Sequence, residues 1–349
     1  MKIRIITIHN IPNFGSVFQT YALARFLQDN GYKDTVVVDY NPPYFKPRTI
    51  KARIAMLLNL RAYYRRKKKF TDFIKRHIPL TNTSFTTVKE LQLTNFEADV
   101  FIAGGDQLWN VYHTCGSDDA YKLTFFKGKK ISYATSMGQE SFPIDALKDL
   151  ASKIKDFSSV SVRETSSVAL LKKVGIKASS CVDPVYLLPA SHYEELLPEI
   201  NEPPYLLVYL VTPSKLLEDA IEYLSKKYGL KVILCSGFSQ KCTCDKFLKD
   251  LGPEEILSYI RHADIILSSS FHATSFSLIF EKQFFTILPG THTNERIVDL
   301  LNVRGLSDRI ISDSTDLKAQ LNNKIDYTQV GSYSQKIEDS IKYLKDNLK

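Results

Sequence analysis

The sequence contains few cysteines and no long apolar run, and each absence excludes a class of protein. Its five cysteines are scattered over 349 residues, and only Cys242 and Cys244 form a close pair. No second pair follows at the spacing of zinc ligands, so a structural zinc site is not expected. An odd number of scattered cysteines is typical of a protein from a reducing compartment. No apolar run reaches the length of a membrane-spanning helix.

No targeting signal is evident at the start of the chain. The first residues, MKIRIITIHN, are rich in β-branched side chains and indicate a strand rather than a secretory signal. Together with the cysteine pattern, this predicts a cytoplasmic protein.

Positive charge is concentrated in one segment of the chain. The net charge is +8, and much of it comes from RAYYRRKKKF, residues 61–70. A solvated helix face is the ordinary interpretation of such a run. An anionic membrane surface and nucleic acid are the alternatives. Because no RNA-binding fingerprint or zinc-finger spacing accompanies the run, we favour the membrane surface of these two and expect no nucleic-acid partner.

Strand and helix patterns alternate along almost the whole chain. The β-branched stretch 2–8 is followed by residues 17–31, where apolar residues such as Phe18 and Phe26 recur at helical spacing. A second buried strand, TVVVDY at 35–40, comes next. Strand, helix and strand at this spacing predict a parallel sheet covered by helices. The fold class is therefore α/β.

The length and the pattern predict two domains. At 349 residues the chain exceeds the size of a usual single hydrophobic core. A second series of strands and helices begins after NEPP, which sets the boundary near Asn201. We expect two Rossmann-like domains that face a central cleft. They span residues 1–200, with an irregular basic insertion at 41–95, and 201–332, and an amphipathic helix follows at 333–349.

The loop after the first strand carries the first candidate residues. In open α/β sheets, ligands bind outside the carboxyl ends of the strands. Here Asn13, Gly15 and Ser16 lead into the first helix. Glycine lets the backbone approach a ligand closely, and the N–H groups of a helix start attract anions. The turn has neither the dinucleotide fingerprint nor the lysine of a P-loop. His9 lies in the same loop and is a candidate cleft residue.

A second candidate loop contains AGGDQLWN. It places Asp106, Gln107 and the only tryptophan, Trp109, directly after a strand. An ordinary turn with a packed tryptophan is one interpretation, and we favour it for Trp109. For Asp106, a carboxylate after two glycines at the edge of the cleft, we favour a functional role.

Arg163 ends a predicted strand in SVSVRE. An arginine at the mouth of a parallel sheet binds phosphate or carboxylate through its planar fork. A salt bridge to the neighbouring Glu164 is the alternative.

His272 is the sharpest candidate in the sequence. The strand DIILSSS leads to it, and Ser269 or Ser270 is the expected N-cap of the helix that follows. A histidine in the first turn of a helix, at the end of a strand, suits a proton donor in an anion site. A capped histidine in an ordinary helix is the alternative.

Together these pieces resemble the polysaccharide pyruvyl transferase family. The resemblance spans most of the chain, and its specificity comes from the order and spacing of the motifs. These are HNIPNFGSVFQTYAL, AGGDQLWN, SVRE, VDPVYLL, the segment around SSSFHATSF, and NERIVDLL. The chain departs from the family at Ala273, where glycine is common, and at Gln283, where proline is common. Residues 41–95 match no motif.

The resemblance implies a fold like the two-domain GT-B glycosyltransferases and a transfer of pyruvate from phosphoenolpyruvate. Two hydroxyls of one sugar receive it as a cyclic ketal, and phosphate is released. The acceptor sugar belongs to a polysaccharide or its lipid-linked precursor, and the final helix is expected to cross back to the first domain. No cofactor or metal is expected.

Residue types then suggest roles in this reaction. The expected catalytic residues are His272 and Asp106, and the expected donor-binding residues are Arg163, Arg296 and Ser270. Around the acceptor we expect Asn13, Gly15, Ser16, Gln107 and His9.

Two other functions stay open at the level of sequence. A GT-B glycosyltransferase that uses a nucleotide sugar has the same architecture. A non-catalytic partner in polysaccharide assembly is the second alternative. If the acceptor is linked to a lipid, the basic run at 61–69 is expected to hold the protein at the inner face of a membrane.

Overall fold

The computed structural model describes residues 1–45, 57–139, 141–209, 212–235, 237, 240–288, 295–311 and 317–349. The chain divides into two compact units. Unit 1 contains residues 1–48, 71–188 and 333–349, and unit 2 contains residues 49–70 and 189–332. The sequence places this boundary near Asn201, whereas the structure has it between Leu188 and Pro189.

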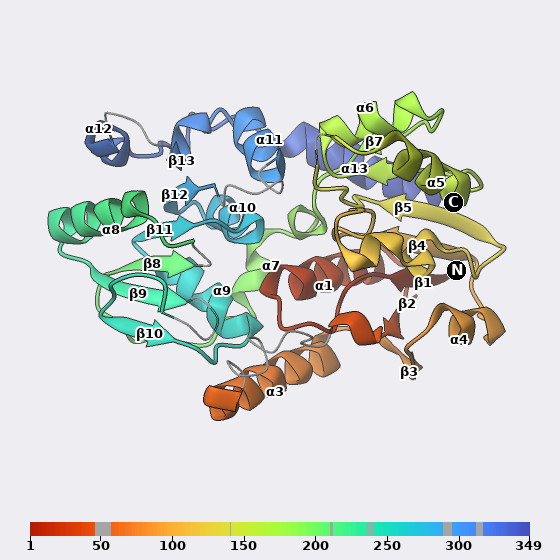
Figure 1. The fold of residues 1–349 in the computed structure, drawn as a ribbon, viewed down its shortest axis with the longest axis horizontal. Coiled ribbons are helices and arrows are strands. Elements are labelled where there is room, and N and C mark those ends of the chain that lie inside the picture. Colours follow the sequence, from red (N-terminus) through yellow and green to blue (C-terminus); the bar gives the residue numbers. More distant parts are fainter. Residues whose placement is uncertain are drawn as a thin grey trace. The chain divides into compact units, whose positions relative to one another are not determined.

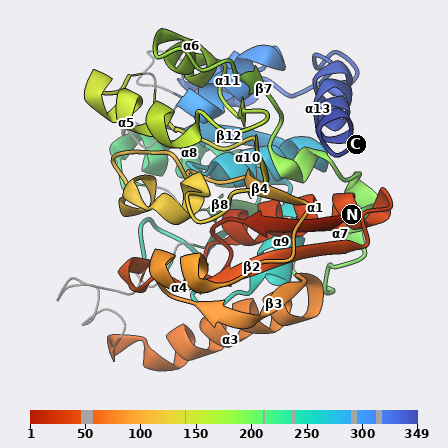
Figure 2. The same ribbon diagram turned by 90° about the vertical axis from the view of Figure 1, so that its right-hand side faces the viewer.

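Unit 1 is built on a five-stranded parallel sheet. Its order is β3-β2-β1-β4-β5, and Figure 2 shows β3, β2 and β1 one beside the next. The strands are β1 (Lys2–Ile6), β2 (Asp34–Tyr40), β3 (Leu80–Phe85), β4 (Val100–Gly104) and β5 (Lys129–Tyr133). A short parallel pair, β6 (Ser161–Val162) and β7 (Ser179–Ser180), follows them in the chain.

Helices cover this sheet. They are α1 (Phe14–Asp29), α4 (Val88–Leu93), α5 (Ile144–Ile154), α6 (Thr165–Lys173) and α13 (Ser334–Asn347), with 3-10 turns η1 (Pro43–Phe45), η2 (Thr114–Ser117), η3 (Asp119–Lys122) and η4 (Pro184–Tyr186). Strand β4 is entirely buried, as its run of apolar residues predicts, and in β1 the three isoleucines are buried. The order of the strands reverses between β1 and β4, so the loops after these two strands lie at a topological switch point.

Unit 2 has a six-stranded parallel sheet in the order β10-β9-β8-β11-β12-β13. The strands are β8 (Tyr205–Tyr209), β9 (Lys231–Cys235), β10 (Lys246–Leu248), β11 (Ile265–Ser268), β12 (Gln283–Ile287) and β13 (Ile310–Ile311). The helices are α7 (Ala190–Glu194), α8 (Lys215–Tyr228), α9 (Pro253–His262), α10 (Phe271–Ile279), α11 (Glu295–Val303) and α12 (Leu317–Asn322), with the turn η5 (Ser307–Arg309). The strand order reverses between β8 and β11, and α10 begins directly after β11.

The segment 41–95, expected to be an irregular insertion, contains a strand of the sheet. Strand β3 pairs with β2 at the edge of the sheet of unit 1, and three of the six residues of its sequence LTNTSF are exposed. Helix α3 (Leu60–His77) precedes it and contains the basic run, which confirms the helical interpretation of that run. Residues 46–56 of the segment lie outside the described residues.

The C-terminal helix α13 belongs to unit 1, although the last residue before it in that unit is Leu188. The Val182 amide donates to Ser340 Oγ at 3.0 Å, and Tyr343 donates its hydroxyl proton to the Ser132 carbonyl at 2.9 Å. Figure 1 shows α13 in the part of the ribbon that contains α5, α6 and β5. Among the described helices, none is long and apolar enough to cross a membrane.

Candidate functional site

The switch point of unit 1 brings four of the predicted residues together. Asn13 caps α1, and its side-chain oxygen accepts from the amides of Gly15 at 2.9 Å and Ser16 at 3.3 Å. Ser16 then donates its hydroxyl proton to Asp106 Oδ2 at 2.5 Å, which joins the loop after β1 to the loop after β4. Asp106 Oδ1 accepts from the Gln107 amide at 2.7 Å. The Asp106 carboxylate is thus buried and oriented by both loops.

The glycines before Asp106 are required by close packing. Gly105 has a φ of +87°, and a Cβ there would lie 1.7 Å from Gln19 Oε1. Gln19 belongs to α1, and its amide nitrogen donates to Thr7 Oγ1 and to the Ser16 carbonyl. Gln19 lies inside the motif HNIPNFGSVFQTYAL, and no pattern in the sequence predicts a role for it. Gln19 is thus hydrogen-bonded to the loop after β1, and its side-chain oxygen packs where a side chain at position 105 would lie.

Arg163 is buried in unit 1 and forms an ion pair with Asp183 at 2.8 Å. The same guanidinium donates to the Gly105 carbonyl. The alternative prediction, a salt bridge between Arg163 and Glu164, is therefore wrong. Glu164 instead accepts from the Ser136 hydroxyl, from the Met137 amide at 3.2 Å and from the Ser167 hydroxyl at 3.0 Å.

Two more predicted residues of unit 1 lie inside the protein. The His9 ring is fully buried, with Nε2 2.9 Å from Asp39 Oδ1 and Nδ1 3.3 Å from the Thr7 carbonyl oxygen. Burial raises the pKa of Asp39, but hydrogen bonds from His9 and Asn41 outweigh it, so the pKa lies below its usual range. His9 therefore fixes a turn, and its full burial argues against contact with an acceptor. Trp109 is also fully buried in the core, as expected.

Gln107 is the fifth predicted residue at this switch point. Its side-chain oxygen accepts from Asn110 at 2.8 Å, and a Cβ on Gly138 would lie 2.9 Å from that oxygen. The residue is half-buried beside Asp106.

The switch point of unit 2 contains the serines and His272. Ser270 is the N-cap of α10, and its hydroxyl accepts from the Ala273 amide at 3.4 Å, which confirms the expected cap. Ser268 accepts from the Ser270 amide at 3.0 Å, and Ser269 donates to the Ile287 carbonyl at 2.6 Å. These bonds tie the start of α10 to the ends of β11 and β12. The loop before Arg296 contains residues 289–294, which lie outside the described residues.

One phenylalanine brings two of the predicted residues of unit 2 into a common neighbourhood. The rings of Phe271 and His272 are 5.2 Å apart at an angle of 85°. The Arg296 guanidinium lies over the Phe271 ring, 5.3 Å from its centroid. His272 is buried, with 7% of its surface exposed, in the first turn of α10. An imidazole, a guanidinium and a helix N-terminus are thus gathered around Phe271, and all three attract an anion.

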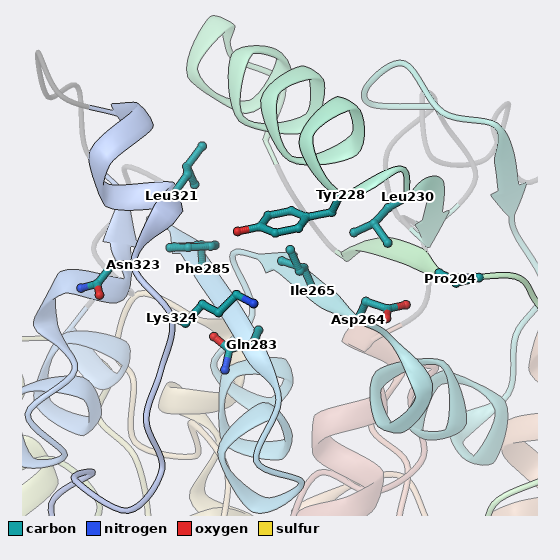
Figure 3. A pocket seen from close by; sticks show the side chains of 10 residues that line it. All are labelled: Pro204, Tyr228, Leu230, Asp264, Ile265, Gln283, Phe285, Leu321, Asn323 and Lys324. Carbon is teal, nitrogen blue, oxygen red and sulfur yellow. The ribbon is translucent and has the colours of Figure 1, made fainter.

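Unit 2 also contains a cavity that is separate from the neighbourhood of Phe271. It has a volume of about 270 Å³. Figure 3 shows its lining, which includes the aromatic rings of Tyr228 and Phe285 and the polar side chains of Asp264, Gln283 and Lys324. Gln283 begins β12 and Asp264 precedes β11, so the cavity is at the amino ends of strands whose carboxyl ends lead to His272 and Ser270. It contains none of the predicted site residues. Within the described residues, no three His, Cys, Asp or Glu side chains gather as a metal-binding group.

Comparison with known proteins gives one family and a set of similar folds. The model of the polysaccharide pyruvyl transferase family matches residues 13–290, most of the chain. Among the curated proteins, no sequence matches.

Several solved structures are similar over the full length. The UDP-GlcNAc 2-epimerase of Methanocaldococcus jannaschii, in complex with UDP-GlcNAc and UDP, has a TM-score of 0.54 at 15% identity, with 99% of each chain covered. The UDP-GlcNAc 2-epimerase of Neisseria meningitidis, bound to UDP-GlcNAc, has a TM-score of 0.55 at 11% identity, with 99% of this chain and 100% of that chain covered. Anabaena HepE, in complex with UDP and glucose, has a TM-score of 0.51 at 11% identity and the same coverage. At these identities the likeness concerns the fold alone, and it confirms the predicted GT-B-like class.

Proposed function

The chain belongs to the polysaccharide pyruvyl transferase family, and from that premise we propose that it moves pyruvate from phosphoenolpyruvate to a sugar. The acceptor gives two hydroxyls of one sugar, in a polysaccharide or its lipid-linked precursor. In the reaction, C3 of the donor gains a proton and one hydroxyl oxygen attacks C2. The C2–O bond to phosphate breaks, and the second hydroxyl closes the cyclic ketal. Of the two hydroxyl protons, one is balanced by the new methyl group and the other by the released phosphate.

The neighbourhood of Phe271 is the single observation that carries this proposal. Phosphoenolpyruvate carries a carboxylate and a phosphate, so its site needs cationic and N–H donors. The start of α10 supplies backbone N–H groups and the positive end of a helix, and Arg296 lies over the same phenylalanine that contacts His272. We assign donor binding to Arg296, Ser270 and the first amides of α10. His272 donates the proton to C3 or to the departing phosphate.

Asp106 is the proposed group for the acceptor. It is hydrogen-bonded to Ser16 and to the Gln107 amide, so its carboxylate has a fixed orientation. A carboxylate held in this way orients a sugar hydroxyl or takes its proton as the oxygen attacks. Asn13, Gly15 and Gln107 shape the loops around it. We keep these residues as acceptor-side positions and give His9 a structural role, because its ring is fully buried.

The role of Arg163 in the proposal follows from its ion pair. Asp183 balances the charge of its guanidinium, and the Gly105 carbonyl accepts a further hydrogen bond. A guanidinium engaged in this way acts on the site through the turn that precedes Asp106. We therefore propose Arg163 as a positioning residue and assign direct contact with the donor to Arg296.

Every step of the proposed reaction is a proton transfer or an exchange of C–O bonds. It therefore requires no redox cofactor, and phosphoenolpyruvate is the co-substrate.

Mass spectrometry of candidate glycans, incubated with the protein and phosphoenolpyruvate, tests the proposal directly. We expect a product heavier than the acceptor by one pyruvic acid less one water, together with an equal amount of phosphate. Parallel reactions with UDP-sugars test the glycosyltransferase alternative through nucleotide release. If neither donor is consumed with any acceptor, a non-catalytic role in polysaccharide assembly replaces the proposal.

The proposal also places the protein at the inner face of a membrane when its acceptor is linked to a lipid. The surface proposed for this contact is the basic helix α3.

A further inference from the structure

Exposed apolar side chains are concentrated just before α3 and in its first turns. Leu57, Leu58, Leu60 and Tyr64 are 63%, 79%, 41% and 60% exposed, respectively. Nine large hydrophobic residues are exposed in the described part of the chain, and these four fall within eight consecutive positions. Scattered exposed apolar residues are normal on a soluble protein, whereas a contiguous group marks an interaction surface.

Exposed basic side chains lie on the same half of α3 as Leu60 and Tyr64. Arg61, Arg65, Lys67 and Lys68 are all exposed. At 100° per residue, the exposed residues of α3 between 60 and 68 fall within one half of the helix circumference. Residues 57–70 contain no aspartate or glutamate. The exposed half of α3 therefore combines apolar groups with positive charge and has no acidic side chain of its own.

Residues 60–70 of α3 belong to unit 2, and the opposite half of this part packs against the start of α9. Lys69 Nζ lies 2.8 Å and 2.7 Å from the two carboxylate oxygens of Glu255, a residue in the first turn of α9. A Cβ on Gly252 would lie 2.7 Å from Lys69 Cβ, so the two backbones approach closely. Phe70 is buried, and Arg66 lies over its ring at 5.6 Å.

We propose that residues 57–68 form a membrane-binding face that lies in the surface of an anionic phospholipid bilayer. Arg61, Lys67 and Lys68 attract the anionic headgroups, while Arg65 also lies 3.6 Å from the Asp250 carboxylate. The leucines and the tyrosine insert between the headgroups, which is how amphipathic interfacial helices bind. A basic run alone is explained by solvation, but Leu60 and Tyr64 on the same half of α3, with Leu57 and Leu58 exposed just before the helix, are not. The inference does not depend on pyruvyl transfer, because bilayer binding involves neither donor nor acceptor.

Charge complementarity favours an anionic bilayer, rather than a second copy of the chain or a nucleic acid, as the partner of this face. In a symmetric dimer the same patch would face itself, which would bring the like charges of Arg61, Lys67 and Lys68 together with those of the second copy. A nucleic acid would use the basic residues but would leave the leucines in water. An anionic bilayer satisfies both kinds of side chain at once.

Co-sedimentation with vesicles tests this inference in the full-length protein. We expect binding to vesicles of phosphatidylcholine with phosphatidylglycerol and little binding to phosphatidylcholine alone. Lys67→Gln with Lys68→Gln should weaken the binding constant by about fivefold for each charge removed. The matched control is Lys172→Gln with Lys173→Gln, two adjacent exposed lysines at the end of α6, which should leave binding unchanged.

A second pair of variants tests insertion rather than charge. Leu58 and Leu93 are both 79% exposed, so serine at either position should leave the fold intact. Leu58→Ser should weaken vesicle binding several-fold, and Leu93→Ser should not. Tryptophan at position 64 (Tyr64→Trp) should shift its fluorescence to the blue on vesicles.

Four outcomes would overturn the inference. They are equal binding to neutral vesicles, equal losses in both lysine pairs, an unchanged constant for Leu58→Ser, and a concentration-dependent dimer that Leu58→Ser dissociates. These measurements use no substrate, so a negative result would not bear on the proposed pyruvyl transfer. Conversely, a protein that binds vesicles but has no transferase activity would still support membrane binding.

Discussion

Arg163 and Asp183 form a buried ion pair of 2.8 Å in unit 1, and it joins three separate segments of the chain. Arg163 follows β6, while Asp183 caps η4 by accepting from the Val185 amide at 3.0 Å. The guanidinium also reaches the carbonyl of Gly105, at the end of β4. The turn that orients Asp106 is thus tied to two segments that lie far along the chain.

Removing one partner of this pair should destabilise the protein strongly. Arg163→Ala leaves the Asp183 carboxylate buried without its cation, and we expect a loss of about 3–5 kcal/mol in the free energy of unfolding. Urea unfolding followed by circular dichroism measures it. Arg25 and Asp29 form an exposed pair on α1, and Arg25→Ala should lose less than about 1 kcal/mol. Similar small losses in both variants would show that the buried pair is not a structural link.

Sequence reasoning finds features that are local in the chain. The alternation of strands and helices follows from apolar periodicity over short windows, and the structure confirms it. The cap at Ser270 depends on residues only three positions apart, and it is also correct. Strand β3 is not predicted from the sequence, because LTNTSF lies at the edge of the sheet and has no alternating apolar pattern.

The misses in the candidate site are contacts between distant residues. Glu164 is the adjacent acid to Arg163, but the fold supplies Asp183, 20 positions later, as the partner. Gln19 is similar, because its fit against Gly105 depends on how α1 packs beside β4. No periodicity or spacing in the sequence encodes either contact.

The close fit between Gly105 and Gln19 gives a second prediction. Gly105→Ala adds a Cβ that would lie 1.7 Å from Gln19 Oε1 and also strains a φ of +87°. Gly175 has a φ of +78° with no atom within 4 Å of an added Cβ, so Gly175→Ala measures the strain alone, about 1 kcal/mol. We expect Gly105→Ala to lose clearly more stability in urea unfolding. Equal losses in the two variants would mean that Gln19 moves aside freely.

The pKa of Asp39 predicts a dependence of stability on pH. Hydrogen bonds from His9 and Asn41 hold this pKa below its usual range, so the folded state favours the carboxylate. The contribution of Asp39 is therefore complete above the ordinary pKa of an aspartate and is lost as the pH falls through the lowered value. Asp39→Asn should be less stable than the wild type at neutral pH, and the difference should shrink on acidification. A difference that stays constant with pH would contradict the assignment.

Arg296 should control the affinity for the donor. Arg296→Ala removes the guanidinium over Phe271, and we expect KM for phosphoenolpyruvate to rise by about 10-fold to 100-fold, the loss of a charge-assisted hydrogen bond. Arg261 gives a matched control, because its guanidinium lies over the ring of Phe280 at 5.7 Å in the same unit. Arg261→Ala should keep the wild-type KM. An unchanged donor saturation curve for Arg296→Ala would remove this residue from the donor site.

His272 is predicted to act on the chemical step rather than on donor binding. His272→Ala should lower kcat by about 10²-fold to 10⁴-fold, the usual contribution of a general acid, and should leave the dissociation constant of phosphoenolpyruvate within a few-fold of the wild type. Phosphate release measures the first quantity, and calorimetric titration measures the second. His262 is the control, because it lies on α9 in the same unit and its ring contacts the Ser258 carbonyl at 2.9 Å. His262→Ala should retain wild-type turnover. If His272→Ala instead weakens donor binding and keeps its kcat, the imidazole is an anion ligand at the start of α10, and the proton must come from another group.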